Sequence, residues 1–257
     1  EDLIDLIWTD RPPMSKEAAI PETFDGKILV PFSPESALSG VHQTIYPDNM
    51  IWYRTVVHPV TLGGGEAVRQ IGDANRLVLH FEAVDYVCAC FINGQFAGMH
   101  VGGYLPFDVD ISAFVDPDDA FEIALCVYDP NDSGTQMRGK QKIEREGIWY
   151  TAQSGIWQSV WLESTPVKFL EKVRITPDYD GAAVHFEFFG TDHVRTRIYD
   201  GETLVADTTD TDVPLPDFKS WSPESPFLYQ VEFEACGEVI RSYFGMRKFS
   251  VGRDLDG

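Results

Sequence analysis

The chain alternates hydrophobic and polar residues over short segments, and this period of two predicts β-strands with one buried face. Turn residues separate the segments, as at Asn93-Gly94, Asp180-Gly181 and Asp200-Gly201. No long segment keeps the 3.6-residue period of a capped helix. The segments richest in β-branched and aromatic residues are 51–57, 76–81, 86–92, 121–128, 160–163, 184–189, 194–199, 228–234 and 239–244. The pattern therefore predicts an all-β protein made of sandwiches.

Strand spacing divides the chain into two domains. From Phe169 to Val251 a hairpin rhythm returns about every ten residues, which fits one immunoglobulin-like β-sandwich. The earlier part has longer loops and fits a larger jelly-roll sandwich. We place the join at Ser164-Thr165-Pro166, which gives a jelly-roll domain at 1–166 and an immunoglobulin-like domain at 167–257.

Charge excludes several classes of partner. The formal net charge is −21, so the surface repels phosphate backbones and anionic lipids, and we expect neither nucleic acid nor membrane partners. No signal peptide is visible at the N-terminus, which favours the cytoplasm. Cys88, Cys90, Cys126 and Cys236 fit buried free thiols. Since no Cys/His spacing suits zinc and no glycine-rich phosphate loop precedes a helix, we expect no metal and no cofactor.

A set of short motifs resembles the non-catalytic front half of glycoside hydrolase family 2, which includes β-galactosidases, β-glucuronidases and β-mannosidases. The most specific is Ser154-Gly155-Ile156-Trp157-Gln158-Ser159-Val160-Trp161-Leu162-Glu163. Further similar stretches follow the family's order along the chain: 51–54, 77–95, 102–107, 138–141, 147–151, 221–229 and 243–248. Their order makes the resemblance specific.

The resemblance implies a galactose-binding-like jelly roll and an immunoglobulin-like domain, followed in the family by a (β/α)₈ barrel. That barrel carries the two carboxyl groups which retaining enzymes hold about 5–5.5 Å apart. This chain stops at Gly257, about where the barrel should begin. We therefore expect the non-catalytic part of a retaining enzyme that hydrolyses O-glycosidic bonds of β-glycosides. We assign no catalytic residue, and we expect the isolated chain to be inactive.

The first twenty residues depart from the family pattern. The family opens with an Asn-Gly-x-Trp strand shortly before the segment that matches 24–31, and residues 1–19 show no such strand. Residues 1–20 are therefore left without a place in the jelly roll.

The polar segment 129–150 is the strongest candidate for a binding edge, because long polar loops on rigid sheets often bind ligands. The resemblance implies that it approaches the substrate pocket of the barrel, as does the loop 39–43. The candidate pocket-edge residues are His42, Arg138, Lys140, Gln141 and Trp149. Some family members contact the sugar with an Asp directly before the Trp, but Ile148 stands there in this chain. A solvated loop or a barrel-docking surface is the alternative, and His42 also fits an ordinary surface residue.

Aromatic residues offer a second kind of binding surface. Trp52, Tyr53, Trp157 and Trp161 could stack on sugar rings, but in alternating strands such residues usually fill the core. Trp157 and Trp161 are four residues apart, which predicts that they share one face. Arg54 beside them fits either a structural pairing with a buried carboxylate, which we favour, or a solvated side chain.

Three functions stay open at this point. The first is the supporting part of a glycosidase, whose carbohydrate substrate binds through the missing barrel. The second is a free-standing carbohydrate-binding module, and the third is a purely structural scaffold. A homo-oligomer is compatible with each of them. Jelly rolls often bind glycans on an exposed concave face, which is the basis of the second alternative.

Overall fold

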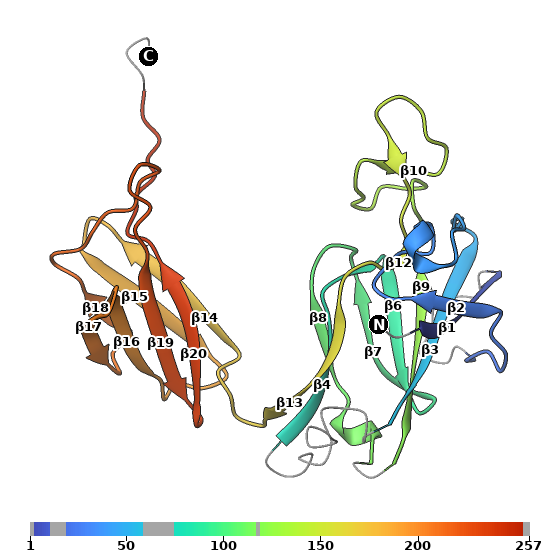
Figure 1. Ribbon diagram of the computed structural model, residues 1–257, viewed down its shortest axis with the longest axis horizontal. Helices are drawn as coiled ribbons and strands as arrows, with labels where there is room; N and C mark the ends of the chain where they lie inside the picture. Colours follow the sequence, from blue (N-terminus) through green and yellow to red (C-terminus); the bar gives the residue numbers. More distant parts are fainter. Residues whose placement is uncertain (1–2, 11–18, 59–74, 117–118, 254–257) are drawn as a thin grey trace. The chain divides into compact units, whose positions relative to one another are not determined.

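The computed structural model describes residues 3–10, 19–58, 75–116 and 119–253, whose regular structure is β-strand apart from two short 3₁₀ helices. The chain forms two compact units, Glu1–Thr165 and Pro166–Gly257, each held together mainly by contacts within itself (Figure 1). The all-β fold class predicted from the alternation is confirmed, and each of the nine predicted segments overlaps a strand.

The first unit is a sandwich of two sheets. Its larger sheet has the order β2-β1-β3-β9-β6-β7 and is antiparallel throughout. The strands are β1 (Leu3–Asp10), β2 (Gly26–Leu29), β3 (Asn49–Val57), β6 (Val87–Ile92), β7 (Gln95–Val101) and β9 (Phe121–Tyr128). Opposite it lie the sheet β13-β4-β8 and the pair β12-β5. These are β4 (Asn75–Phe81), β5 (Val84–Asp85), β8 (Phe107–Asp110), β12 (Gly155–Ile156) and β13 (Val160–Pro166).

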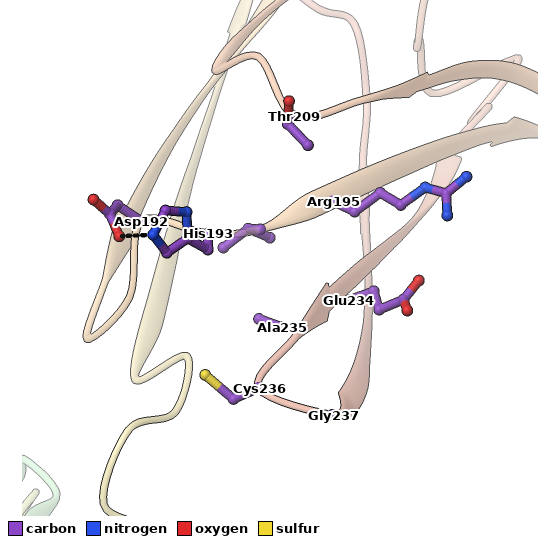
Figure 2. A pocket seen from close by; sticks show the side chains of 9 residues that line it. Asp192, His193, Arg195, Thr209, Glu234, Ala235, Cys236 and Gly237 are labelled. Atoms are coloured by element: carbon purple, nitrogen blue, oxygen red, sulfur yellow. Dashed lines mark ion pairs between the residues drawn. The ribbon is translucent and has the colours of Figure 1, made fainter.

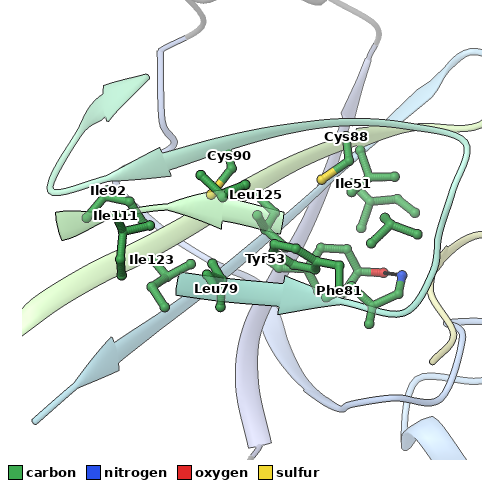
Figure 3. Packing of buried hydrophobic residues seen from close by; sticks show 14 of the residues in the cluster. Ile51, Tyr53, Leu79, Phe81, Cys88, Cys90, Ile92, Ile111, Ile123 and Leu125 are labelled. Atoms are coloured by element: carbon green, nitrogen blue, oxygen red, sulfur yellow. Dashed lines mark hydrogen bonds between the residues drawn. The ribbon is translucent and has the colours of Figure 1, made fainter. Parts of the chain in front are cut away.

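Side chains from both sheets meet in one buried core, where Tyr53, Leu79 and Leu125 lie between the layers (Figure 3). The outer face of β3 is also covered: Trp52 is buried in a second cluster with Phe91. Because neighbouring strand residues point to opposite faces, Trp52 and Tyr53 fill different clusters. The strand at the centre of the jelly roll is therefore apolar on both sides.

Arg54 sits on β3 with its guanidinium carbon 4.2 Å from the centre of the Phe24 ring. Its Nε lies 4.0 Å from a carboxylate oxygen of Glu122. These contacts agree with the structural role expected for Arg54.

Residues 3–10, within the segment that the sequence left without a place, form β1 of the larger sheet. β1 lies between β2 and β3, with Ile4 opposite Ile28 and Leu6 opposite Tyr53. The sequence of this strand, LIDLIWTD, has no period of two and does not match the family's opening motif. Its strand character comes from pairing on both edges, which the local pattern does not reveal.

One aromatic prediction and one cysteine prediction are wrong. Trp161 is 44% exposed and does not lie in the core. The chain leaves strand geometry between β12 and β13, so the parity of Trp157 and Trp161 does not determine which faces they share. Val160 and Leu162 pack toward the core, whereas Trp161 stacks on His80 with ring centroids 4.9 Å apart. Cys236 is exposed because it occupies the turn between β19 and β20, while the other three thiols are buried.

The second unit is a smaller sandwich. One sheet has the order β14-β15-β18 and the other β17-β16-β19-β20. The strands are β14 (Lys172–Asp178), β15 (Ala183–Phe189), β16 (Arg195–Asp200), β17 (Thr203–Thr208), β18 (Asp212–Pro214), β19 (Tyr229–Ala235) and β20 (Glu238–Phe244). Phe186 is fully buried and meets Phe233 edge-on, with ring centroids 5.4 Å apart. This aromatic core joins the two sheets of the immunoglobulin-like unit.

Candidate functional site

Three connections between strands meet at one end of the jelly roll. Val127 near the end of β9 pairs with Ile51 near the start of β3, and Val87 at the start of β6 pairs with both Tyr128 and Val101. The connections that leave this end are residues 30–48 (loop 30–48), 102–106 and 131–151. We call residues 131–151 the arm. It contains the parallel pair β10 (Gln141–Lys142) and β11 (Tyr150–Thr151) and extends beyond the sandwich (Figure 1).

A buried polar network fastens the bases of these connections. The Glu35 carboxylate accepts hydrogen bonds from the backbone N–H groups of Ile45 at 3.4 Å and Ser154 at 3.1 Å. The Asn131 amide donates to the carbonyl of Ile45 and to the hydroxyl of Ser154, both at 3.1 Å. Glu35, Asn131 and Ser154 are all buried. One network therefore holds loop 30–48, the base of the arm and the approach to β12 together.

Two further contacts extend the anchoring. The Tyr53 hydroxyl accepts a hydrogen bond from the backbone of Ile156 at 3.3 Å. The indole N–H of Trp157 donates to the carbonyl of Gly103 at 2.8 Å. The connection 102–106 is thereby tied to the same region.

Three buried carboxyl groups, Glu35, Asp85 and Asp129, form what we call the carboxyl cluster. Burial raises the pKa of Glu35 to about 7, although backbone N–H groups that include those of Ser154 and Ile45 partly oppose the change. Burial, with smaller contributions from the charges of Asp129 and Glu35, raises the pKa of Asp85 to about 8. Burial also raises the pKa of Asp129. Near neutral pH, protons therefore neutralise part of this cluster.

The five pocket-edge candidates lie on two of the three connections. His42 is exposed on loop 30–48, and Arg138, Lys140, Gln141 and Trp149 all lie on the arm. A guanidinium N–H of Arg138 donates to the carbonyl of Asp132 at 3.2 Å. Their role at a pocket edge stays a prediction.

Exposed apolar side chains gather on the same connections. All are more than half exposed: Leu38, Tyr46, Leu105, Met137, Ile148 and Tyr150. A group of large apolar side chains on polar loops is typical of a surface that another protein surface covers. This end of the jelly roll thus carries both the polar candidates and six exposed apolar side chains.

The sequence did not point to the carboxyl cluster or to its hydrogen-bond partners. Glu35 lies on loop 30–48, Asp85 ends β5 and Asp129 directly follows β9, so no local spacing joins them. The available signal was Asp85, a carboxylate within the otherwise apolar run 83–92. A charged residue inside such a run indicates either a turn or a buried polar group.

The immunoglobulin-like unit has an open hollow of about 570 Å³ lined by residues that include Asp192, His193, Arg195 and Cys236 (Figure 2). The Asp192 and His193 side chains are almost fully exposed, and Arg195 is already paired with Asp207. These contacts describe a shallow surface between a loop and a turn. We place no site there.

Within residues 3–10, 19–58, 75–116 and 119–253, no three His, Cys, Asp or Glu side chains are grouped so as to hold a metal ion. The same residues contain no helix long and apolar enough to cross a membrane.

Comparison with known proteins defines the class. Residues 66–166 match the family described as "Glycosyl hydrolases family 2, sugar binding domain", and residues 172–247 match "Glycosyl hydrolases family 2". Together the matches cover more than half of the chain. The chain therefore belongs to glycosyl hydrolase family 2, as its motifs predicted.

Individual relatives are longer than this chain. It is 25% identical over 192 residues to the β-galactosidase of Thermoanaerobacter pseudethanolicus, a match that covers 65% of this chain and 25% of that protein. It is 23% identical over 225 residues to the β-glucuronidase of Streptococcus agalactiae, which covers 78% of this chain and 36% of the relative. The solved Ruminococcus gnavus β-glucuronidase shares the fold, with a TM-score of 0.68 and 19% identity over 98% of this chain and 44% of that one.

Gly155 provides a test of the anchoring. It has φ +75°, and a Cβ at this position would lie 1.9 Å from the Tyr53 hydroxyl oxygen. We expect Gly155→Ala to displace Tyr53 from Ile156 and to lower the free energy of unfolding by about 2 kcal/mol or more. Urea denaturation measures the change. Gly26→Ala is the control, because a methyl group there would meet no atom within 4 Å and the φ of Gly26 is ordinary; equal stability of the two variants would contradict the packing described.

The carboxyl cluster predicts a dependence of stability on pH. The folded-state pKa values of Glu35 and Asp85 exceed the ordinary ones, so the folded state binds more protons between about pH 4 and pH 8. Stability contributed by these protons is present below this window and is lost as the pH rises through it. We expect Asp85→Asn to flatten the profile and to be more stable than the unaltered chain by about 2 kcal/mol at about pH 8.5, since one pKa unit corresponds to about 1.4 kcal/mol.

Urea denaturation followed by tryptophan fluorescence suits this measurement, because five of the six tryptophans belong to the first unit. Asp25→Asn removes an exposed carboxylate from the same unit and should leave the profile unchanged. If Asp85→Asn and Asp25→Asn gave the same slope against pH, the cluster would not be the titrating group.

Proposed function

We propose that this chain is the supporting part of a retaining β-glycosidase. In this proposal the two sandwiches brace a catalytic (β/α)₈ barrel, and the arm and loop 30–48 form the rim of its substrate pocket. Membership of glycosyl hydrolase family 2 supports the reaction class. The chain spans between a quarter and about a third of the β-galactosidase and β-glucuronidase it was compared with, which leaves room for a catalytic domain in such proteins.

The observation that carries this proposal is the composition of one end of the jelly roll. Apolar side chains such as Leu105 and Met137 are exposed there beside the polar candidates Arg138 and Lys140. Ligand sites combine an apolar lining with a few fixed polar groups, and they form preferentially between domains. The buried network at the base supplies the fixed geometry that a pocket rim requires.

The chemical step is assigned to the barrel for a physical reason. A retaining glycosidase needs two carboxyl groups that both reach the glycosidic bond. Glu35, Asp85 and Asp129 are close enough to influence one another electrostatically, but all three are buried. Glu35 and Asp129 accept hydrogen bonds from backbone N–H groups, and Asp85 is only 5% exposed, so we give all three a structural role.

Carbohydrate binding without a barrel is a second candidate function, and the exposure of Trp161 favours it. The indole stacks on His80, whose Nδ1 lies 2.6 Å from Asp108 and whose Nε2 lies 3.0 Å from Glu163. An exposed indole can stack on the apolar face of a pyranose, and carboxylates accept hydrogen bonds from sugar hydroxyls.

The gene that encodes this chain tests the first proposal. We expect its reading frame to continue beyond Gly257 into a sequence of about 250 residues with a (β/α)₈ pattern. The product of the whole frame should hydrolyse an aryl β-galactoside or β-glucuronide, and residues 1–257 alone should release no aryl alcohol. A stop codon soon after Gly257, or hydrolysis by the isolated chain, would exclude the proposed arrangement.

Trp161→Ala tests the second candidate. If the outer face of β13 binds glycans, calorimetric titration of this chain with neutral β-linked oligosaccharides should show binding that this variant weakens about tenfold, since stacking contributes about 1 kcal/mol or more. Val205→Ala is the control, because Val205 is similarly exposed, at 43%, on β17 of the second unit. The second candidate is excluded if no neutral glycan binds, or if both variants bind equally well.

A further inference from the structure

Within residues 138–145 the arm gathers four cations that have no carboxylate partner in the described part of the chain, whereas most described cations elsewhere pair with a carboxylate and others, such as Lys168, Lys172, Arg247 and Arg253, are spread along 168–253. Eight arginine or lysine side chains elsewhere each lie within 4.0 Å of a carboxylate: Arg54, Arg76, Arg174, Arg195, Arg197, Lys219, Arg241 and Lys248. The arm carries Arg138, Lys140, Lys142 and Arg145, together with three acidic residues. Across the ranges that the structure describes, none of these four cations forms an ion pair with a carboxylate. A chain of net charge −21 therefore presents four unneutralised cations in one short segment.

Neutral groups hold three of these cations in place. Arg138 donates to the carbonyl of Asp132 at 3.2 Å, and Arg145 donates to the Thr151 hydroxyl at 3.0 Å. The ammonium group of Lys142 lies 4.8 Å from the centre of the Trp149 ring. Such partners orient a cation and leave its charge available, whereas a carboxylate would neutralise it.

Lys140 is exposed, and the arm backbone fixes its position. The Tyr150 N–H donates to the Lys140 carbonyl at 2.9 Å, next to the β10–β11 pair. Lys140 and Lys142 are two residues apart around the short strand β10, and Arg138 precedes them by two. The spacing brings one guanidinium and two ammonium groups onto the same segment.

We propose that the arm binds an anionic carbohydrate, with Arg138, Lys140 and Lys142 contacting the carboxylate of a uronic acid or a sulfate ester and Trp149 beside the sugar ring. A guanidinium matches the two oxygens of either anion, and an ammonium adds a point charge. The remainder of the acidic surface repels long polyanions, so the site favours a short anionic sugar segment over nucleic acid. Placement of this anion at the rim of a catalytic pocket rests on the proposed function, whereas binding to the arm does not require a barrel.

The 257-residue chain tests this inference by isothermal titration with three probes of matched length: an oligogalacturonate, a sulfated dextran oligosaccharide and a neutral galacto-oligosaccharide. We expect at least one anionic probe to bind at least tenfold more tightly than the neutral one. Affinity should fall between about 20 and about 300 mM salt, because salt screens exposed charges. The stronger of the two anionic probes identifies carboxylate or sulfate as the preferred group.

Variants locate the site. Arg138→Gln combined with Lys140→Gln should weaken anion binding about tenfold or more, as expected when two contacts to a charged group are lost. The matched control is Lys168→Gln combined with Lys172→Gln, which removes two positive charges from the second unit and should leave affinity unchanged. Arg138→Lys with Lys140→Arg keeps the charge and should retain most of the binding, which shows that the arm still folds.

The inference would be overturned by no binding of either anionic probe, by equal affinity for the neutral probe, or by equal losses in the arm and control variants. Tighter binding of a single-stranded oligonucleotide of the same charge would also overturn it, in favour of a nucleic acid partner. These results are independent of the barrel. A reading frame that ends near Gly257 contradicts the proposed function and leaves anion binding by the arm unaffected.

Discussion

The hydrogen-bonded network around Glu35, Asn131 and Ser154 is the constraint on which the candidate site depends. Loop 30–48 and most of the arm contain no strand, so sheet pairing fixes little of their position. Each buried backbone group that lost its partner would cost about 1–3 kcal/mol, which makes alternative loop positions unfavourable. The network therefore fixes loop 30–48 and the base of the arm against the β-sandwich, although neither is held there by strand pairing.

The same network contains buried carboxyl groups, and burial opposes their ionisation. Glu35 accepts two backbone hydrogen bonds that favour its charged form, while burial favours its neutral form and raises its pKa to about 7. Burial dominates the pKa of Asp85, and the neighbouring charges that shift it further are those of two other carboxyl groups. Anchoring through buried carboxyl groups thus couples the order of the loops to proton concentration. An anchor made of amides alone would lack this coupling.

Sequence alone predicted the strands whose two faces differ or whose composition is strongly β-branched. β9 was predicted at its observed bounds, and β3 and β19 within two residues. The pattern failed for β1, whose neighbours in the sheet are β2 and β3, and for Trp161, where a break after Ile156 resets the alternation. In both cases the deciding information is which segments pair, and a period along the chain does not contain it.

The candidate site also has a part that the sequence predicted and a part that it did not. The arm was predicted because a long polar segment between two strands is visible in the sequence, and four of the five pocket-edge candidates lie on it. The carboxyl cluster was not predicted, because Asp85 and Asp129 become neighbours only when the sheets assemble. Motifs of glycosyl hydrolase family 2 identified the class of protein but did not indicate which side chains anchor the loops.

The contrast between the arm and the immunoglobulin-like unit bears on what the arm does. In the second unit Arg197 and Arg241 both pair with Glu232, and hydrogen bonds from these cations lower the pKa of that carboxyl group. These ion pairs neutralise the positive charges, as is typical of a solvated sheet face. In the arm, cations are oriented by a carbonyl, a hydroxyl and an indole instead, although Glu144 and Glu146 lie on the same segment. Carboxylates are abundant in this chain, so the concentration of such cations within residues 138–145 supports the proposed binding of an external anion by the arm.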